Sequence, residues 1–253
     1  MYIYNKILES RNKGLKQLAV LIDPDNPDFS NLEKLVEVSI RSKVDYFFVG
    51  GSTSHDNQID KILELLNSQV NIPVVIFPGN DKQIRSNADA LLLLSMISGR
   101  NPEYLIGQHV QSAEILYHSN IDIIPCGYML IDGGKMTAVN YVSQTQTIGQ
   151  DDLKTARNTA LAGQFLGLKL IYLEAGSGAL NPVNESMINS VSKILDIPLI
   201  VGGGINSVDK AISGLRNGAD IIVIGNAFEK KPELVKDITG AIQSINSFSI
   251  ELD

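Results

Sequence analysis

The sequence predicts an α/β fold, and within that class a (β/α)8 barrel, from three observations. Short apolar or β-branched runs recur eight times along the 253 residues. These runs are nearly continuous and do not alternate with polar residues, which is typical of parallel strands covered on both faces. Stretches with helical spacing of apolar residues lie between most of them. A single barrel domain over residues 1–253 is therefore expected, and a doubly wound open sheet is the alternative.

The expected strands, in chain order, are residues 18–23, 45–51, 73–79, 90–97, 121–131, 168–176, 198–204 and 220–227. A helix is expected after the first strand, where Ser30 and Glu33 have the spacing of a capping box. Another is expected to end at Gly218, because glycine commonly terminates helices. The alternation of strands and helices thus extends over most of the chain.

Two connections depart from this alternation. Only residues 80–89 separate the third and fourth strands, which is too short for a helix with two loops. The third barrel helix is therefore expected to be missing or replaced by extended chain. Residues 127–150 are longer than a plain strand-to-helix loop needs, and they predict a turn followed by an irregular active-site segment.

The charge and composition exclude several classes of protein. The net charge is −7 and no basic cluster is present, which argues against binding nucleic acid. The apolar runs are too short for a membrane helix, and the first residues lack a secretory signal, so a cytoplasmic protein is expected. The single cysteine, Cys126, is expected to be a buried core residue. A polyanionic ligand would have to be bound by backbone amides or by a metal.

Two glycine-rich turns follow the seventh and eighth expected strands, namely "VGGGINS" and "VIGNAF". In a barrel the active site lies at the carboxyl ends of the strands, and turns after strands seven and eight often bind phosphate through backbone amides. The alternative is that these glycines serve only tight turns. Their position in both loops favours a phosphate site.

The stretch "YLEAGSGA" at residues 172–179 is more specific. Tyr172 and Glu174 are two residues apart on a strand, so both side chains are expected on the same side, in the barrel mouth. A buried carboxylate is unfavourable unless it is used or paired. Next to a bound phosphate, Glu174 could accept a proton from a substrate hydroxyl or hold that hydroxyl. The alternative is an ion pair with a neighbouring Lys or Arg.

The motifs "LIDPD", "FVGGS", "YLEAGSGA", "VGGGI" and "VIGNAFE", in this order and spacing, resemble the geranylgeranylglyceryl phosphate synthase family, which includes heptaprenylglyceryl phosphate synthases. The resemblance covers nearly the whole chain and is greater to the archaeal-type branch that also occurs in some bacteria. Members of this family are modified (β/α)8 TIM barrels with an incomplete third βα unit. That property agrees with the short segment at residues 80–89.

The resemblance implies Mg²⁺-dependent transfer of a geranylgeranyl group from its diphosphate to the C3 hydroxyl of sn-glycerol 1-phosphate. It implies Glu174 and Tyr172 as catalytic residues and Asp23 and Ser52 as metal ligands. The glycerol phosphate site maps onto Tyr172, Leu173, Glu174, Ala175, Gly176, Ser177, Gly178, Gly203, Gly204, Gly225 and Asn226. It also implies a homo-oligomer, dimer or hexamer, and transient contact with a membrane surface is possible for an enzyme with a lipid substrate.

Three aspartates follow the first expected strand in "VLIDPDNPDFS". Asp23 is the expected magnesium ligand, because a hard cation bound by carboxylate oxygen neutralises the charge on a leaving diphosphate. Its alternative is a turn role beside Pro24. Asp25 is either a partner of Asp23 or a turn residue, and Asp28 is expected to begin a helix. Some family members carry lysine where this chain has Leu21, so any role of that lysine must be absent or met by another group.

A prenyl chain would need an apolar groove leading away from the metal. Candidates are the incomplete third segment and the later helix, with Tyr104, Leu105, Val110 and Leu116, although core packing also explains these residues. The alternatives to the expected activity are a heptaprenyl donor, another phosphate-binding barrel enzyme such as an isomerase, and a non-catalytic phosphometabolite-binding barrel. An isomerase would normally need a further acid-base pair at the mouth.

Overall fold

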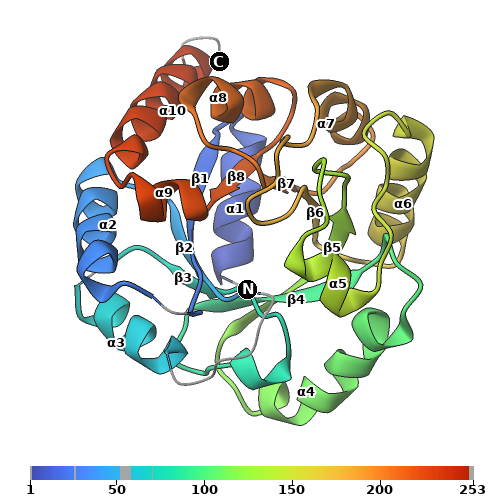
Figure 1. Cartoon of the computed structure of the whole chain (residues 1–253), viewed down its shortest axis with the longest axis horizontal. Helices are drawn as coiled ribbons and strands as arrows, with labels where there is room; N and C mark the ends of the chain where they lie inside the picture. Colours follow the sequence, from blue (N-terminus) through green and yellow to red (C-terminus); the bar gives the residue numbers. More distant parts are fainter. Residues whose placement is uncertain (1, 26, 52–57, 70, 251–253) are drawn as a thin grey trace.

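Eight parallel strands close into a barrel in the computed structural model, which describes residues 2–25, 27–51, 58–69 and 71–250 (Figure 1). β1 pairs with both β2 and β8, and this closure excludes the open-sheet alternative. All eight expected strands are confirmed. They are β1 Gln17–Ile22, β2 Tyr46–Val49, β3 Val74–Ile76, β4 Ala90–Met96, β5 Asp122–Leu130, β6 Leu170–Glu174, β7 Leu199–Gly202 and β8 Ile221–Ile224.

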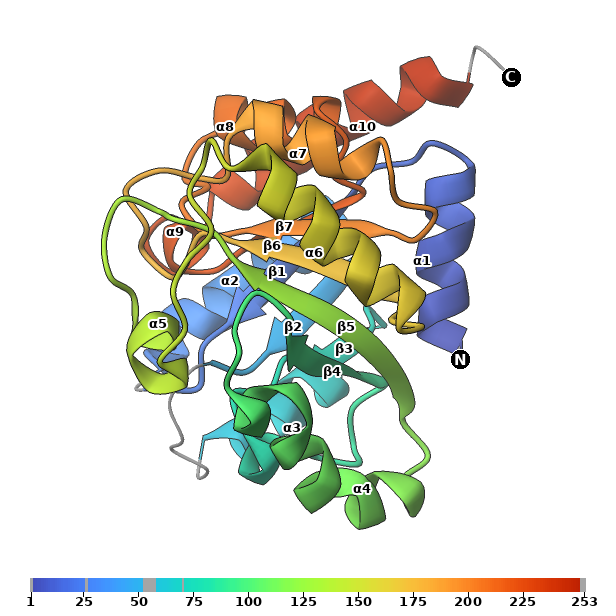
Figure 2. The ribbon, with the colours of Figure 1, turned by 90° about the vertical axis from the view of Figure 1, so that its right-hand side faces the viewer.

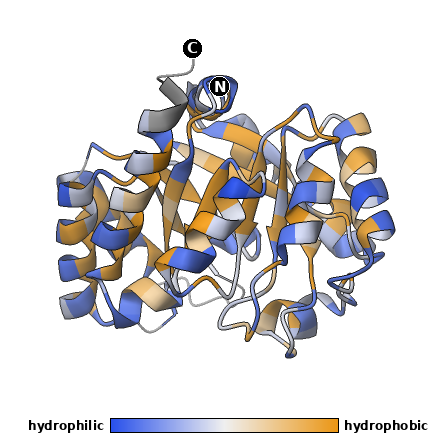
Figure 3. Ribbon diagram, turned by 90° about the horizontal axis from the view of Figure 1, so that it is seen from above, coloured by the Kyte–Doolittle hydropathy of each residue, from blue (hydrophilic) through white to orange (hydrophobic). Residues whose placement is uncertain are grey.

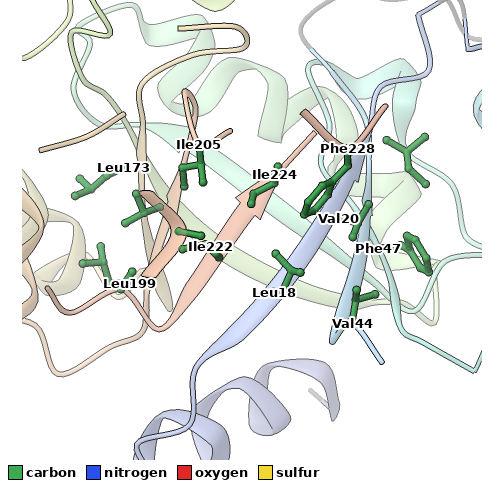
Figure 4. Close-up of a cluster of buried hydrophobic side chains, with 14 of the residues drawn as sticks. Leu18, Val20, Val44, Phe47, Leu173, Leu199, Ile205, Ile222, Ile224 and Phe228 are labelled. Atoms are coloured by element: carbon green, nitrogen blue, oxygen red, sulfur yellow. The ribbon is translucent and has the colours of Figure 1, made fainter. Parts of the chain in front are cut away.

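The strands are apolar throughout because both of their faces are buried. Outward side chains such as Leu18, Phe47 and Ile222 pack in a layer between the strands and the helices (Figure 4). Inward side chains such as Ala19 and Phe48 fill the barrel itself. Successive side chains along a strand therefore alternate between two apolar layers, which explains why the sequence shows no alternation of polar and apolar residues.

An outer ring of helices covers the barrel (Figures 1 and 3). Its helices are α2 Phe29–Ser42, α3 Ile59–Gln69, α4 Gln108–Tyr117, α6 Leu153–Phe165, α7 Glu185–Ser192, α8 Val208–Arg216 and α10 Leu234–Ile250. The helix stop at Gly218 is confirmed within two residues. The capping box predicted at Ser30 is wrong, because the carboxylate of Asp28 accepts the backbone N–H groups of Ser30 and Asn31 and so caps α2.

The third βα unit is incomplete, as expected. β3 and β4 are joined only by a three-residue 3₁₀ turn, Asp81–Gln83, and extended chain. Before α4 the chain forms a short π-helical turn, Glu103–Gly107. The connection after β5 is long, as expected, and contains the short helix α5, Ala138–Ser143. Within the described residues the third unit therefore contributes no α-helix to the outer ring, whereas the connection after β5 leads into α6.

The two ends of the barrel differ. Helix α1, Tyr2–Asn12, lies across the amino-terminal ends of the strands, opposite α5 (Figure 2). Its side chains Ile3, Tyr4 and Ile7 pack into the inner apolar layer. The carboxyl ends of the strands bear the loops and α9, Asn226–Lys230. None of the helices in the described part of the chain has the length and apolarity needed to cross a bilayer.

Candidate active site

A cavity of about 300 Å³ opens at the carboxyl ends of the strands. Its lining brings together side chains and turns that are up to about 200 residues apart in the sequence. Of the predicted site residues, it includes Asp23, Tyr172, Glu174, Ser177, Gly178, Gly203, Gly204, Gly225 and Asn226. Ser52 lies outside the described residues. The agreement places one site at the mouth of the barrel.

Tyr172 and Glu174 point into the barrel mouth from β6, as their spacing predicts. Leu173, between them, points outward into the layer under the helices (Figure 4). Ala175 is buried in that same outer layer. Leu173 and Ala175 therefore do not line the cavity with their side chains, and any contact they make with a ligand must come from their backbone.

Glu174 is a buried carboxylate without a cation partner. It is only 6% exposed, and no Lys or Arg of the described chain forms an ion pair with it. Burial raises the pKa of Glu174 to about 7, although the backbone N–H of Gly176, 2.5 Å from Oε1, and the hydroxyls of Tyr172 and Tyr128 act to lower it. The ion-pair alternative is therefore not observed, and the carboxylate is suited to proton exchange near neutral pH.

An aromatic cluster forms the floor beneath Glu174. The ring of Tyr172 lies 5.2 Å from that of Tyr128 on β5 and 5.4 Å from that of Phe77 after β3, between centroids. The buried hydroxyl of Tyr172 forms no hydrogen bond of ordinary geometry with the described residues. It is still near enough to Glu174 to lower the pKa of that carboxyl. A buried polar group of this kind is unfavourable unless a ligand satisfies it. The geometry thus leaves Tyr172 Oη ready to bind a ligand hydroxyl.

Sequence reasoning missed Tyr128 and Phe77. Tyr128 stands directly beside Tyr172 in the pairing of β5 with β6. The sequence shows Tyr128 only as an aromatic residue inside a long expected strand. The register of β5 with β6 is needed to place it beside Tyr172 and near Glu174. Burial raises the pKa of the Tyr128 phenol well above its usual value, and the nearby Glu174 raises it further, so it acts as a neutral hydrogen-bond donor.

The loops after β6, β7 and β8 converge beside Glu174. Gly203 has φ of +83°, and a Cβ on it would lie 2.4 Å from Glu174 Oε1. Ser177 and Asn226 meet across the cavity, with Asn226 Nδ2 3.0 Å from Ser177 Oγ. These turns present backbone amides and small polar groups rather than bulky side chains. The arrangement agrees with an anion site next to the carboxylate.

Gly203→Ala is expected to remove ligand binding at this turn. The new methyl group would collide with the Glu174 carboxylate, and the positive φ is strained for alanine, so unfolding free energy should fall by roughly 1–3 kcal/mol. Denaturant unfolding and calorimetric titration with glycerol phosphate would measure both effects. Gly149→Ala is the matched control, because a Cβ there meets nothing within 4 Å. Unchanged binding by the Gly203 variant would contradict this assignment.

Asp23 directly follows β1 and lines the same cavity. Its Oδ1 accepts the backbone N–H of Asp25 at 2.9 Å, so Asp25 supports Asp23 through its backbone. Burial raises the pKa of the Asp23 carboxyl, which a bound cation would reverse. Asp28 caps α2, as expected of a residue that begins a helix. Leu21 also lines the cavity and lies against Gly225. The place where some relatives carry a lysine side chain is therefore filled by an apolar side chain.

A second carboxylate near Asp23, that of Glu229 on α9, was not identified from the sequence. Glu229 accepts a hydrogen bond from the backbone N–H of Asp23, and both residues line the cavity. Burial raises the pKa of Glu229, and the Asp23 charge raises it further. Among the described residues no three acidic, His or Cys side chains form a complete metal cage. The donors present fit a cation that takes one or two protein carboxylates and completes its shell elsewhere, as magnesium does.

A smaller apolar cavity of about 60 Å³ adjoins the first. Both cavities are lined by Gly51, Phe77, Tyr128 and Val139. The smaller cavity extends along the incomplete third unit to Tyr104. The sequence indicates both as candidates for an apolar groove. Of the other candidates, Leu116 is buried in the outer layer, Val110 is 69% exposed, and Leu105 does not line this cavity.

Comparison with known proteins agrees with this geometry. Residues 8–243 match the PcrB family. A geranylgeranylglyceryl phosphate synthase of Chitinophaga pinensis is 46% identical over 242 residues, which cover 96% of each chain. One of Thermococcus gammatolerans is 38% identical over 236 residues, covering 93% of this chain and 91% of that protein.

A solved structure gives the same result. The (S)-3-O-geranylgeranylglyceryl phosphate synthase of Thermoplasma acidophilum, in complex with sn-glycerol-1-phosphate, superposes with a TM-score of 0.89 at 33% identity and covers 96% of this chain and 98% of that one. A thiamine phosphate pyrophosphorylase of Pyrococcus furiosus, at 14% identity and a TM-score of 0.56, shares the fold alone. From its sequence match, its relatives and its barrel, this chain belongs to the PcrB family.

Proposed function

We propose that the protein is a prenyltransferase that joins the geranylgeranyl group of its diphosphate to the C3 hydroxyl of sn-glycerol 1-phosphate. The products are the ether-linked geranylgeranylglyceryl phosphate and diphosphate. The observation that carries this proposal is Glu174, a buried carboxylate that has no ion-pair partner among the described residues and faces a cavity walled by glycine turns. The names of the relatives and the glycerol phosphate bound by the Thermoplasma protein support the choice of substrate.

Different residues of the cavity are proposed to bind the phosphate and to accept the hydroxyl proton. The glycine turns after β6, β7 and β8 would bind the phosphate of glycerol phosphate through backbone amides. Its C3 hydroxyl would then reach Glu174, with Tyr172 Oη as a second partner. The hydroxyl oxygen forms the new bond to the allylic carbon as the bond from that carbon to the diphosphate breaks. The hydroxyl proton passes to Glu174, and the electron pair of the broken bond leaves with the diphosphate.

Asp23 is proposed to bind magnesium, with Ser52 as the second ligand that the resemblance implies. Magnesium, when bound, would neutralise the negative charge that gathers on the departing diphosphate. Asp23 fits this role because its carboxylate faces the cavity and one of its oxygens is held by the backbone N–H of Asp25. Glu229, adjacent to it, adds negative charge to the same wall of the site.

The apolar cavity beside Phe77 and Tyr104 is proposed to receive the first part of the prenyl chain. It adjoins the main cavity and runs where the third barrel helix is replaced by a short turn. Leu94 and Met96 of β4 line this cavity and provide apolar surface that an isoprenoid can cover. The homo-oligomer, the contact with a membrane surface and the cytoplasmic location stay predictions.

The experiment that tests the activity is product formation from labelled sn-glycerol 1-phosphate with prenyl diphosphates of increasing length, with and without magnesium. Magnesium-dependent ether product with a maximum at the geranylgeranyl donor would support the proposal. A maximum at longer donors would instead identify a heptaprenyl enzyme. Binding of glycerol phosphate without product from any donor would overturn the transferase and leave a phosphate-binding barrel.

The rate is expected to rise with pH through about pH 7. Only ionised Glu174 can accept the hydroxyl proton, and its pKa is raised to about 7 by burial. Below that pH the carboxyl is protonated and kcat/KM should fall about tenfold per pH unit. A kcat/KM profile between pH 5 and 9, at saturating magnesium, measures this limb. A flat profile across pH 6–8 would show that Glu174 orients the hydroxyl without removing its proton.

A further inference from the structure

We infer that Lys135 binds the phosphate group of the acceptor substrate, an inference that rests on the proposed function and assigns this lysine to its anion site. Gly178 has no side chain, and the space that a Cβ would fill there lies 3.4 Å from Lys135 Nζ and 3.8 Å from Asn226 Nδ2. The loop after β5 and the start of α9 thus place two donors beside the turn that follows β6. This turn carries Ser177 and Gly178 and lies at the rim of the main cavity.

The loop that carries Lys135 contacts the loop after β6, residues 175–184, both before and after the lysine. Before it, the carbonyl of Gly133 accepts the backbone N–H groups of Leu180 and Asn181 at 3.0 and 3.1 Å. After it, Thr137 packs so closely on Gly176 that a Cβ on this glycine would lie 2.3 Å from the threonine methyl group. The backbone at Lys135 is therefore positioned, although the side chain itself is exposed.

The acidic side chains of the cavity would repel a phosphate group unless a nearby cation offsets their charge. Asp23, Glu174 and Glu229 line the cavity with three carboxylates, whereas Lys230 is the single basic residue in the described lining. A phosphate monoester adds close to two further negative charges at neutral pH. Backbone amides supply only partial charges, so a lysine at the rim would offset the repulsion between acceptor and carboxylates. Lys135 forms no ion pair with any carboxylate of the described structure and is available for this contact.

The position of Lys135 also bears on the lysine that some family members carry where this chain has Leu21. Leu21 lies against Gly225 on the β1 side of the cavity. Lys135 comes instead from the loop after β5, and its Nζ lies beside Gly178 in the turn after β6. It supplies positive charge to the anion site from a different element, and its partner is the acceptor phosphate rather than the wall near Asp23.

The test is calorimetric titration of sn-glycerol 1-phosphate, with inorganic phosphate as a second probe, into wild-type protein and the Lys135→Met, Lys135→Arg and Lys154→Met variants. Loss of one charge-assisted contact should raise the dissociation constant roughly 10- to 100-fold in Lys135→Met. Lys135→Arg should recover most of the affinity. Lys154→Met should not change it, because that exposed lysine on α6, unlike Lys135, has no atom within 4 Å of the place a Cβ on Gly178 would take. Thermal unfolding of each variant checks that the fold is retained.

Steady-state kinetics provide the second readout. In Lys135→Met the KM for glycerol phosphate should rise by a similar factor, with kcat within about threefold and the KM for the prenyl diphosphate unchanged. Unaltered glycerol phosphate affinity in Lys135→Met would overturn the inference, as would an effect confined to the prenyl diphosphate. Wild-type protein that binds glycerol phosphate but forms no ether would refute the proposed reaction while leaving this binding test intact.

Discussion

Glu174→Gln is expected to lower kcat by roughly two to four orders of magnitude while glycerol phosphate still binds. The amide keeps the shape of the side chain and an oxygen that can accept the Gly176 N–H, but it cannot take a proton from the C3 hydroxyl. Single-turnover kinetics at pH 8 and calorimetric titration would separate the two effects. Unchanged turnover in this variant would refute the role of Glu174 as the proton acceptor and favour a non-catalytic binding barrel.

The same variant should be more stable than the wild-type protein at alkaline pH. The pKa of Glu174 is raised from 4.5 to about 7 by burial, so its contribution to stability is fully present below pH 4.5 and is lost as pH rises through 7. Above pH 7 the ionised, buried group costs about 3 kcal/mol. Glutamine removes this cost. Denaturant unfolding at pH 5 and pH 8 should show a stability gain that is larger at pH 8, and an equal gain at both would contradict the raised pKa.

Asp23→Asn is expected to lower turnover at least about 100-fold and to weaken binding of divalent cations. The amide oxygen is neutral and is a poorer ligand for a hard cation than a carboxylate. Calorimetric titration of Mn²⁺ in the presence of inorganic diphosphate gives a readout that does not depend on turnover. Asp28→Asn is the matched control, because asparagine also caps helices and α2 should begin unchanged. Equal Mn²⁺ affinity in the Asp23 variant and the wild-type protein would remove Asp23 from the metal site.

The barrel was predictable because its strands are buried on both faces. This burial produces the near-continuous apolar runs, and the carboxyl ends of such strands meet at one end of the barrel. Asp23, Glu174 and Gly203 could therefore be assigned to one site from their positions after strands. The short third connection was also predictable, since chain length alone excludes a helix there.

The helix cap at α2 shows where local patterns were insufficient. Ser30 and Glu33 have the spacing of a capping box, but Asp28 offers a carboxylate two residues earlier and caps the helix. Both arrangements satisfy backbone N–H groups at a helix start. In the structure α2 begins at Phe29, which packs against the outer apolar layer, so Ser30 lies inside the first turn and is not the cap.

The sequence by itself was enough to predict the strand order and the end of the barrel at which Asp23, Glu174 and the glycine turns meet, because each of them follows an apolar run. Their acid-base and metal roles stay predictions. The tertiary structure decided the environment of those residues. Only barrel closure places Tyr128 and Phe77 beside Tyr172 and buries Glu174 with no ion-pair partner in the described part of the chain. Only the packing of the loops after β5 and β6 and the start of α9 brings Lys135, Gly178 and Asn226 together. Desolvation and charge depend on neighbours in space, and these neighbours are tens of residues apart along the chain.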